Sequence, residues 1–288
     1  MQGAHLFDLP PELIVRILKE FDEQSLGRLK TVSRYLNALI EKHRGALAKQ
    51  SIYMAIFKQD ELIVERFLSR CRWEDYKYAI SGPHIDPSIL RQLDCALIDT
   101  MSFQMRISDE LAEELARRLS ALKSSVFRLS FVRCHLSAKA FIALISALKP
   151  QQLTIEFDLA FDGISSRVLC DHVSFREMEH LNLVNSRLTD CDLRRISAEH
   201  LTVYEKSELT LEGLRQLLLD WYNGKRSIQD YHLSISERIV PERLFHGLTT
   251  RRRSIIAWEL RNFNSVLHVS IIGPGVSIAK VFNLLECS

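Results

Sequence analysis

Two short stretches of the sequence place a thiol and an imidazole close together along the chain. They are Cys134-His135 and Cys170-Asp171-His172. A cysteine beside a histidine can act as a nucleophile with its general base, and the same groups are zinc ligands. In a strand, however, neighbouring residues point to opposite faces, and a structural zinc site takes four ligands in paired spacing. We therefore expect neither a catalytic cysteine nor a bound metal.

Motifs of common enzymes are also missing from the sequence. It contains no G-x-x-x-x-G-K-[ST], G-x-G-x-x-G, H-E-x-x-H or G-x-S-x-G pattern, which removes the usual support for nucleotide-dependent, metalloprotease or esterase chemistry. The six cysteines lie far apart with no C-x-x-C pair, as expected for reduced core residues of a cytoplasmic or nuclear protein. We expect no enzymatic activity and no cofactor.

Two further groups of residues could bind a partner. Arg251-Arg252-Arg253 is a triple basic run, which could recognise carboxylate or phosphate groups, although three adjacent charges more often form a solvated loop. Trp221 and Tyr222 follow a stripe of leucines, a position more typical of core residues than of a ligand platform.

Overall composition limits the possible partners. The chain has 38 basic and 36 acidic residues, and its formal net charge of +2 does not favour binding to nucleic acid or to an anionic membrane. Its first residues do not resemble a secretory signal. The longest uncharged stretch, Asn262 to Ala279, is interrupted by polar residues, glycine and proline, so no membrane span is expected.

Leucine patterning points to the elements that position these residues. Leucine supplies 43 of the 288 residues. The stretch from Leu129 to Leu136 fits the leucine-rich template L-x-L-x-x-N/C-x-L, with Cys134 in the turn, and the stretch from Leu181 to Leu188 fits nearly as well. Four further L-x-apolar triplets keep only the strand part of the template: Leu153-Thr-Ile155, Leu201-Thr-Val203, Leu233-Ser-Ile235 and Leu267-His-Val269.

Apolar stripes at helical spacing lie between these strands, after the capping candidates Ser108, Ser137 and Thr210. Alternating strands and helices predict a parallel sheet with helices on one side. The predicted fold class for residues 93–288 is therefore an irregular leucine-rich-repeat-like α/β solenoid. A compact α/β domain without repeats is the alternative.

The N-terminal part of the sequence predicts a small helical module. Pro10 and Pro11 can begin a first helix, and Ser25 and Ser33 can cap a second and a third. Three helices in under 40 residues bury too little surface to be stable alone. In residues 46–92, apolar residues at Ile52, Ile56 and Phe57 and at Leu62, Ile63, Phe67 and Leu68 predict two more helices. The turn-rich segment Gly82–Pro87 marks a domain boundary.

The helical module also resembles a known family. Leu9-Pro10-Pro11-Glu12-Leu13, Ile17-Leu18 and Val32-Ser33-Arg34 are similar to the F-box, which docks substrate receptors onto the Skp adaptor of Skp–cullin–F-box ubiquitin ligases. Leu36 stands where the family usually has tryptophan. The alternative is an ordinary amphipathic helical hairpin that packs on its own domain. The resemblance implies adaptor docking through six residues: Leu9, Pro10, Leu13, Ile17, Leu26 and Val32.

Together these features predict a three-part chain: an F-box module at 1–45, a helical linker region at 46–92 and a repeat-like region at 93–288. Residues 201–235 also resemble the F-box-associated region of nematode F-box families. The predicted function is a ubiquitin-ligase substrate receptor that binds a Skp-family adaptor, through it a cullin, and a target protein. A leucine-rich-repeat scaffold without a ubiquitin role is the alternative. Strand alternation assigns four residues to the target surface: Asn182, Thr202, Tyr204 and Ser234.

Overall fold

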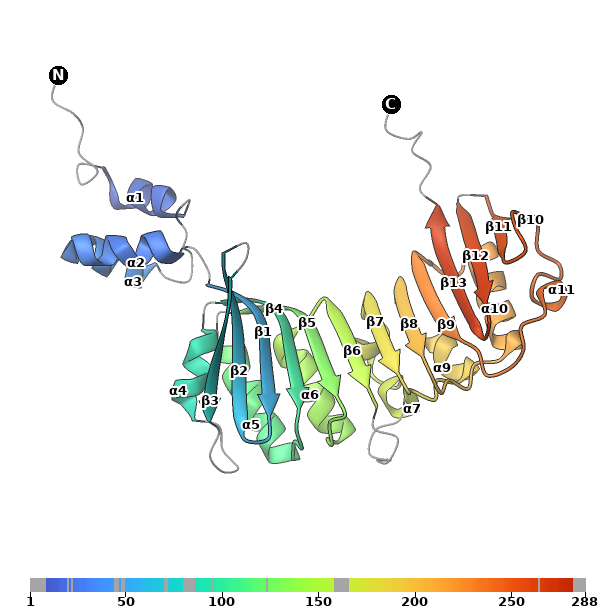
Figure 1. The fold of residues 1–288 in the computed structure, drawn as a ribbon, viewed down its shortest axis with the longest axis horizontal. Coiled ribbons are helices and arrows are strands. Elements are labelled where there is room, and N and C mark those ends of the chain that lie inside the picture. Colours follow the sequence, from blue (N-terminus) through green and yellow to red (C-terminus); the bar gives the residue numbers. More distant parts are fainter. Residues whose placement is uncertain are drawn as a thin grey trace, which may run out of the picture.

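The structure is a computed structural model of the 288-residue chain. It describes residues 9–281 except for residues 20, 22, 44–46, 48–49, 70–71, 80–85, 95, 123, 158–165 and 264. The described residues form three N-terminal helices followed by a mixed α/β region with one large sheet (Figure 1).

The N-terminal helices are α1 (Pro11–Leu18), α2 (Glu23–Val32) and α3 (Arg34–Lys42). Pro11 occupies the first turn of α1, and the Ser33 side chain caps α3 by accepting a hydrogen bond from the Tyr35 N–H at 3.2 Å. The second helix begins two residues before Ser25, so this serine lies inside the helix and is not its cap. The module has a small core of its own, built mainly from Ile14, Val15, Leu18, Leu26, Leu36, Leu39, Ile40 and Leu47.

The sheet contains 13 strands in the order β10-β11-β12-β13-β9-β8-β7-β6-β5-β4-β1-β2-β3. Its centre consists of six parallel strands that follow one another in sequence order. These are β4 (Ala96–Gln104), β5 (Ser125–Val132), β6 (Gln152–Glu156), β7 (His180–Val184), β8 (His200–Tyr204) and β9 (Asp230–Ser234).

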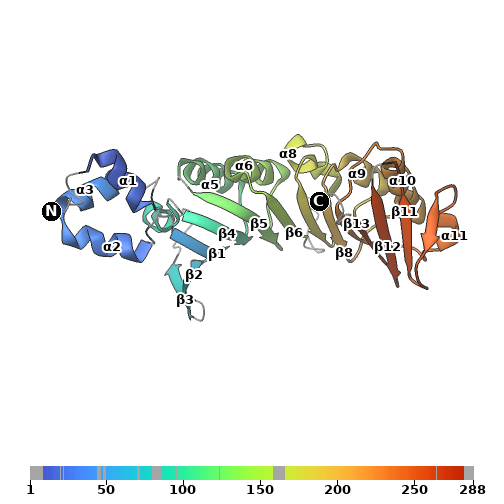
Figure 2. The same ribbon diagram turned by 90° about the horizontal axis from the view of Figure 1, so that it is seen from above.

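Helical segments connect the central strands and cover one face of the sheet (Figure 2). They are α5 (Asp109–Ala121), α6 (Ala138–Leu148), α7 (Ser166–Leu169), α8 (Val173–Arg176), α9 (Asp190–Arg195) and α10 (Leu211–Tyr222). The expected pattern of parallel strands with helices on one side is therefore correct for this part of the chain. The opposite face of β4 to β9, here called the open face, carries no helix among the residues that the structure describes (Figure 2).

Both ends of the sheet are antiparallel. One end adds β1 (Gln50–Lys58), β2 (Glu61–Ser69) and β3 (Arg72–Ala79), and β1 pairs in parallel with β4. The other end adds β13 (Gly275–Val281), β12 (Val266–Ile272), β11 (Ala257–Arg261) and β10 (Thr250–Arg252). Short helices complete the fold: α4 (Pro87–Leu90), a 3₁₀ turn (Arg91–Leu93) and α11 (Pro241–Leu244).

This arrangement corrects three predictions. Residues 50–58, 61–69 and 72–79 form strands of the main sheet and not two helices, so the expected helical linker at 46–92 is wrong and the sheet runs across the predicted boundary. The segment Leu267–Val269 is a strand, but an antiparallel one outside the parallel centre. Strand β4 was not predicted. Of the predicted turn Gly82–Pro87, residues 82–85 lie outside the described part of the chain.

Alternation along the central strands explains the core. In β6, β7 and β9 the residues at the second and fourth positions are buried, and those between them are half-buried on the open face. Phenylalanines continue the core toward β1, because Phe57, Phe103 and Phe131 are aligned on adjacent strands and stack with ring centroids 4.9 and 5.5 Å apart. The predicted inward position of the leucines is confirmed.

The chain leaves three of these strands through the same backbone conformation. Arg133, Asn185 and Glu205 directly follow β5, β7 and β8, and their φ angles of 50°, 56° and 54° are left-handed. The N–H of Arg133 donates to the Glu156 carbonyl at 2.9 Å, and the N–H of Asn185 donates to the Tyr204 carbonyl at 3.0 Å. The turns after β5 and β7 are thus each tied to the end of the next strand.

Helix caps tie neighbouring helices to one another. The carboxylate of Asp190, at the start of α9, accepts hydrogen bonds from the Thr210 N–H at 2.9 Å and from the Thr210 hydroxyl at 2.6 Å. Thr210 is itself the N-cap of α10, where its oxygen accepts from the Gly213 N–H at 3.1 Å. An added Cβ at Gly213 would lie 1.9 Å from the Asp190 Oδ1 atom.

Gly213→Ala is therefore expected to destabilise the protein by about 1–3 kcal/mol, although alanine normally favours a helix by up to about 1 kcal/mol over glycine. The methyl group would displace the Asp190 carboxylate from the α10 cap. Thermal unfolding of the full chain would measure the effect. Gly27→Ala is the control, because a Cβ there meets nothing within 4 Å, and an equal loss of stability in both variants would contradict the explanation.

Candidate functional site

The first candidate surface is an apolar stripe on α1. Ile14, Val15 and Leu18 face the core of the module. Leu13 and Ile17, which are one helical turn apart on the other side, remain 43% and 39% exposed, and Phe21 is similarly exposed just beyond the helix. A module with its own core thus leaves large apolar side chains in contact with water, which is typical of a surface that binds another protein.

The six residues assigned to adaptor docking do not all lie on the surface. Pro10, Leu13, Ile17 and Val32 are exposed, Val32 at 72%, whereas Leu9 is half-buried against the helical core. Leu26 is only 5% exposed and is one of the core residues. This placement gives Leu26 a role in stabilising the module and not in direct contact.

Leu36 also lies in the core of the module. It is among the most fully buried side chains, packed in the same cluster as Leu26. A leucine at this position is therefore accommodated by packing within the module. Because the position is buried, having leucine there in place of tryptophan does not change the exposed surface of the module.

The second candidate surface is the open face of the sheet. Asn182 on β7 pairs in register with Thr202 on β8, and Val184 pairs with Tyr204. Tyr204 is 51% exposed, while Asn182, Thr202 and Ser234 are half-buried. All four predicted target residues therefore lie on β7, β8 and β9, at positions between the inward-facing apolar residues.

Two of these four residues share a hollow. Tyr204 and Ser234 line a depression of about 190 Å³ where β8 and β9 meet β13. Its other lining residues include His232 and Ile272, and the Ile272 side chain is exposed. Asn182 and Thr202 do not line it, although they lie on the same open face.

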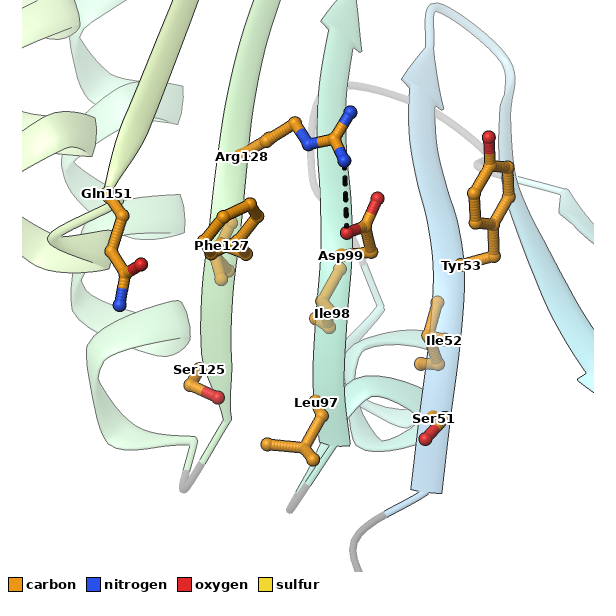
Figure 3. Close-up of a pocket in the computed structure, with 11 residues that line it drawn as sticks. Ser51, Ile52, Tyr53, Leu97, Ile98, Asp99, Ser125, Phe127, Arg128 and Gln151 are labelled. Carbon is orange, nitrogen blue, oxygen red and sulfur yellow. Dashed lines mark ion pairs between the residues drawn. The ribbon is translucent and has the colours of Figure 1, made fainter. Parts of the chain in front are cut away.

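A larger hollow, of about 720 Å³, lies at the start of β1, β4 and β5 (Figure 3). Exposed side chains of Tyr53, Leu97 and Phe127 line it, and the Arg128 guanidinium lies 3.5 Å from the Asp99 carboxylate. The sequence interpretation missed this hollow, because two of its three strands were not predicted. Finding it requires knowing which strands pair with one another, and the residue pattern within one strand does not contain that information.

Burial makes two of the described cysteines, Cys134 and Cys170, poor nucleophiles. Burial raises the pKa of the Cys134 thiol to about 11 and that of the Cys170 thiol to about 12. The Cys134 Sγ atom donates to the Phe103 carbonyl at 2.8 Å. A nucleophilic cysteine needs a lowered pKa, so the two thiol–imidazole stretches do not supply one. Cys71, Cys95 and Cys287 lie outside the described residues.

Labelling with a thiol reagent should distinguish these cysteines. Cys191 is exposed on α9, whereas Cys134 is half-buried with a raised pKa. We expect the native protein at neutral pH to label at Cys191 at least tenfold faster than at Cys134, because the thiolate is the reactive form. Peptide mapping by mass spectrometry after brief exposure would measure both sites, and equal rates would show that the Cys134 environment is not as described.

The triple basic run lies at the edge of the sheet, and its side chains are exposed, as predicted, but its first two residues form a strand and not a loop. Arg251 and Arg252 belong to β10, and the Arg252 guanidinium lies over the Trp258 ring at 5.8 Å. Arg253 forms an ion pair with Glu259, which also accepts from the Nε of Arg261 at 2.6 Å. Hydrogen bonds from these two arginines lower the pKa of Glu259. Trp221 is buried in the core, as predicted.

Comparison with known proteins identifies one part of the chain. Residues 6–44 match the F-box-like family model, so the N-terminal helical module is an F-box-like domain. No curated protein matches the sequence. None of the helices in the described residues combines the length and apolar character needed to cross a bilayer.

Proposed function

We propose that this chain is the substrate-recognition subunit of a Skp–cullin–F-box ubiquitin ligase. The observation that carries the proposal is the F-box-like match at residues 6–44 on a module that exposes an apolar stripe at Leu13, Ile17 and Phe21. Burying this stripe against a Skp-family adaptor would offset the small size of the module's own core. The adaptor would link the chain to a cullin.

The mixed α/β region would hold the target protein. Six sequential parallel strands, alternating leucines and the repeated left-handed turn after β5, β7 and β8 support a leucine-rich-repeat-like solenoid, in which each repeat covers its neighbour. We place the target on the open face, around Asn182, Thr202, Tyr204 and Ser234. The region would be of the kind also found beside the F-box in nematode F-box families.

In this role the chain performs no chemistry. It would act by proximity, holding the target where the catalytic partners of the ligase reach its lysines. The raised pKa values of Cys134 and Cys170 argue only against these two thiols as nucleophiles. Such a receptor would work in the cytoplasm or nucleus.

Coexpression tests the proposal directly. The full chain would be produced with and without a Skp-family adaptor, and the complex would be analysed by size-exclusion chromatography with light scattering. We expect a one-to-one complex and a higher soluble yield in the presence of the adaptor. A folded chain that remains monomeric beside an excess of adaptor would instead support a binding scaffold with no ubiquitin role.

A further inference from the structure

Two histidines lie side by side on the open face of the sheet. His180 begins β7 and His200 begins β8, and the two residues are paired in the parallel register. Their imidazole rings are stacked, with centroids 4.1 Å apart and an interplanar angle of 14°. Adjacent strands are about 4.8 Å apart. The stacking of the rings therefore follows from having a histidine at the same position in two adjacent strands.

A carboxylate completes this group. The Glu179 Oε1 atom lies 3.5 Å from the Nε2 atom of His180. Three ligand atoms, one each from Glu179, His180 and His200, lie within 4.8 Å of one another. Among the residues that the structure describes, no other trio of histidine, cysteine, aspartate or glutamate side chains comes this close.

The backbone holds the three residues in place. The Glu179 carbonyl accepts hydrogen bonds from the N–H groups of Glu199 and His200, at 3.1 and 3.0 Å. The residue that supplies the carboxylate is therefore bonded directly to the strand that supplies the second imidazole. Both histidines are half-buried and Glu179 is exposed, so an ion from solvent can reach the ligand atoms.

We propose that Glu179, His180 and His200 bind one divalent transition-metal ion of the class that includes Zn²⁺, Co²⁺, Ni²⁺ and Cu²⁺. Two imidazoles with one carboxylate suit these ions better than Mg²⁺ or Ca²⁺, which prefer oxygen ligands. Metal–nitrogen bonds of about 2.0–2.1 Å bring two tetrahedral nitrogen ligands to about 3.4 Å from each other. Side-chain rotation can supply this change while the strands stay in place.

Bound there, the ion joins β7 to β8 and keeps at least one coordination position for water or for a side chain of a bound partner. The site does not rest on the proposed ligase role, since it is argued only from the side chains and the register of β7 and β8, although it shares the open face with the proposed target surface. A signal for it exists in the sequence, where Glu-His-Leu occurs both at residues 179–181 and at residues 199–201. Because this triplet occurs at the start of two adjacent strands, the two imidazoles lie side by side.

A matched control lies on the next strand. His232 of β9 occupies the open face, and its Nε2 atom is 3.4 Å from an Asp230 carboxylate oxygen. It pairs in register with Thr202 and so has no imidazole at the paired position on β8. His232 thus offers one imidazole and one carboxylate, whereas the proposed site offers two imidazoles and one carboxylate.

The test titrates the full-length, tag-free chain with Co²⁺ and follows visible absorption, then displaces Co²⁺ with Zn²⁺. We expect one equivalent to bind at micromolar concentration, and His180→Gln or His200→Gln to weaken binding by about tenfold or more. His232→Gln should leave it unchanged. Zn²⁺ should raise the melting temperature of the wild type and of His232→Gln, but not of the other two variants.

Three outcomes would overturn the proposal. The first is no stoichiometric binding in the micromolar range. The second is an equal loss in His232→Gln, which would indicate adventitious binding only. The third is wild-type affinity in a folded variant with both His180 and His200 replaced by glutamine. Circular dichroism would verify folding, and if one of the single variants does not fold, the other provides the comparison.

Discussion

Replacing Leu13 and Ile17 together by glutamine is expected to abolish copurification with a Skp-family adaptor while the sheet stays folded. Both side chains point away from the core of the module and are about two-fifths exposed to solvent. Full burial of such a side chain stabilises by about 1.5–3 kcal/mol, and a buried amide without a partner costs about 1–3 kcal/mol. Together the changes should weaken binding by about 2–4 kcal/mol, roughly thirtyfold to several hundredfold.

A double variant on the same helix provides the control. Glu12 and Arg16 are exposed and lie on the polar side of α1, and Glu12→Gln with Arg16→Gln introduces the same residue type twice. We expect this variant to bind the adaptor normally in isothermal titration calorimetry with the purified adaptor. Comparable loss in both double variants, or retained binding in the Leu13 and Ile17 variant, would contradict docking through the apolar stripe.

The sequence predicted the helical module well, because its signals are short-range. Proline in the first turn of α1 and the Ser33 cap of α3 fix helix ends within a few residues. The exposure of individual residues was harder to predict. Leu26 and Val32 both belong to the family-like string, but only Val32 is exposed, since exposure depends on how three helices pack and not on residue type.

Strand β1 shows why residues 50–79 were misread. Its pairing with β2 is irregular between Ile52 and Met54, and the buried residues change from Ile52 to Ala55 and Phe57. This irregularity breaks the two-residue alternation that identifies a strand. The turn into β2 consists of Gln59 and Asp60, without the Asn-Gly or Asp-Gly signal that typically marks a hairpin.

The larger hollow depended on the same error. Most of its residues come from β1, β4 and β5, and β1 lies beside β4 only because the chain returns to β1 after forming β2 and β3. Phe127 and Arg128 both line it although they are consecutive in sequence, so an alternation rule would have placed one of them in the core. By contrast, the regular strands β7 to β9 present Asn182, Thr202, Tyr204 and Ser234 as alternation predicts.

Tyr204→Ala is expected to weaken capture of the target protein by about thirtyfold. Tyr204 is a large, half-exposed aromatic side chain at the edge of the hollow that Ser234 and Ile272 also line. Aromatic side chains that become buried at the centre of an interface typically contribute about 2 kcal/mol or more to binding. Its loss should therefore raise the dissociation rate of the target without affecting the adaptor contact.

Arg252→Ala is the matched comparison, and we expect it to retain the target. Arg252 lies on the edge strand β10, where its guanidinium already packs over Trp258. On the open face, Glu156 at the end of β6 is paired with Arg133 at 2.7 Å. A surface whose charges are already paired attracts a partner mainly through apolar contact and hydrogen bonds, so capture should change little between low and moderate salt.

Quantitative mass spectrometry would compare the proteins retained by the adaptor complexes of the wild type, Tyr204→Ala and Arg252→Ala at two salt concentrations. The expected result is a set of proteins that the wild type and Arg252→Ala retain equally and that Tyr204→Ala loses. Loss with Arg252→Ala instead, or affinity that falls by orders of magnitude with added salt, would place the target on the basic edge of the sheet. A target surface at that edge would use charge, because the arginines of β10 are exposed cations there.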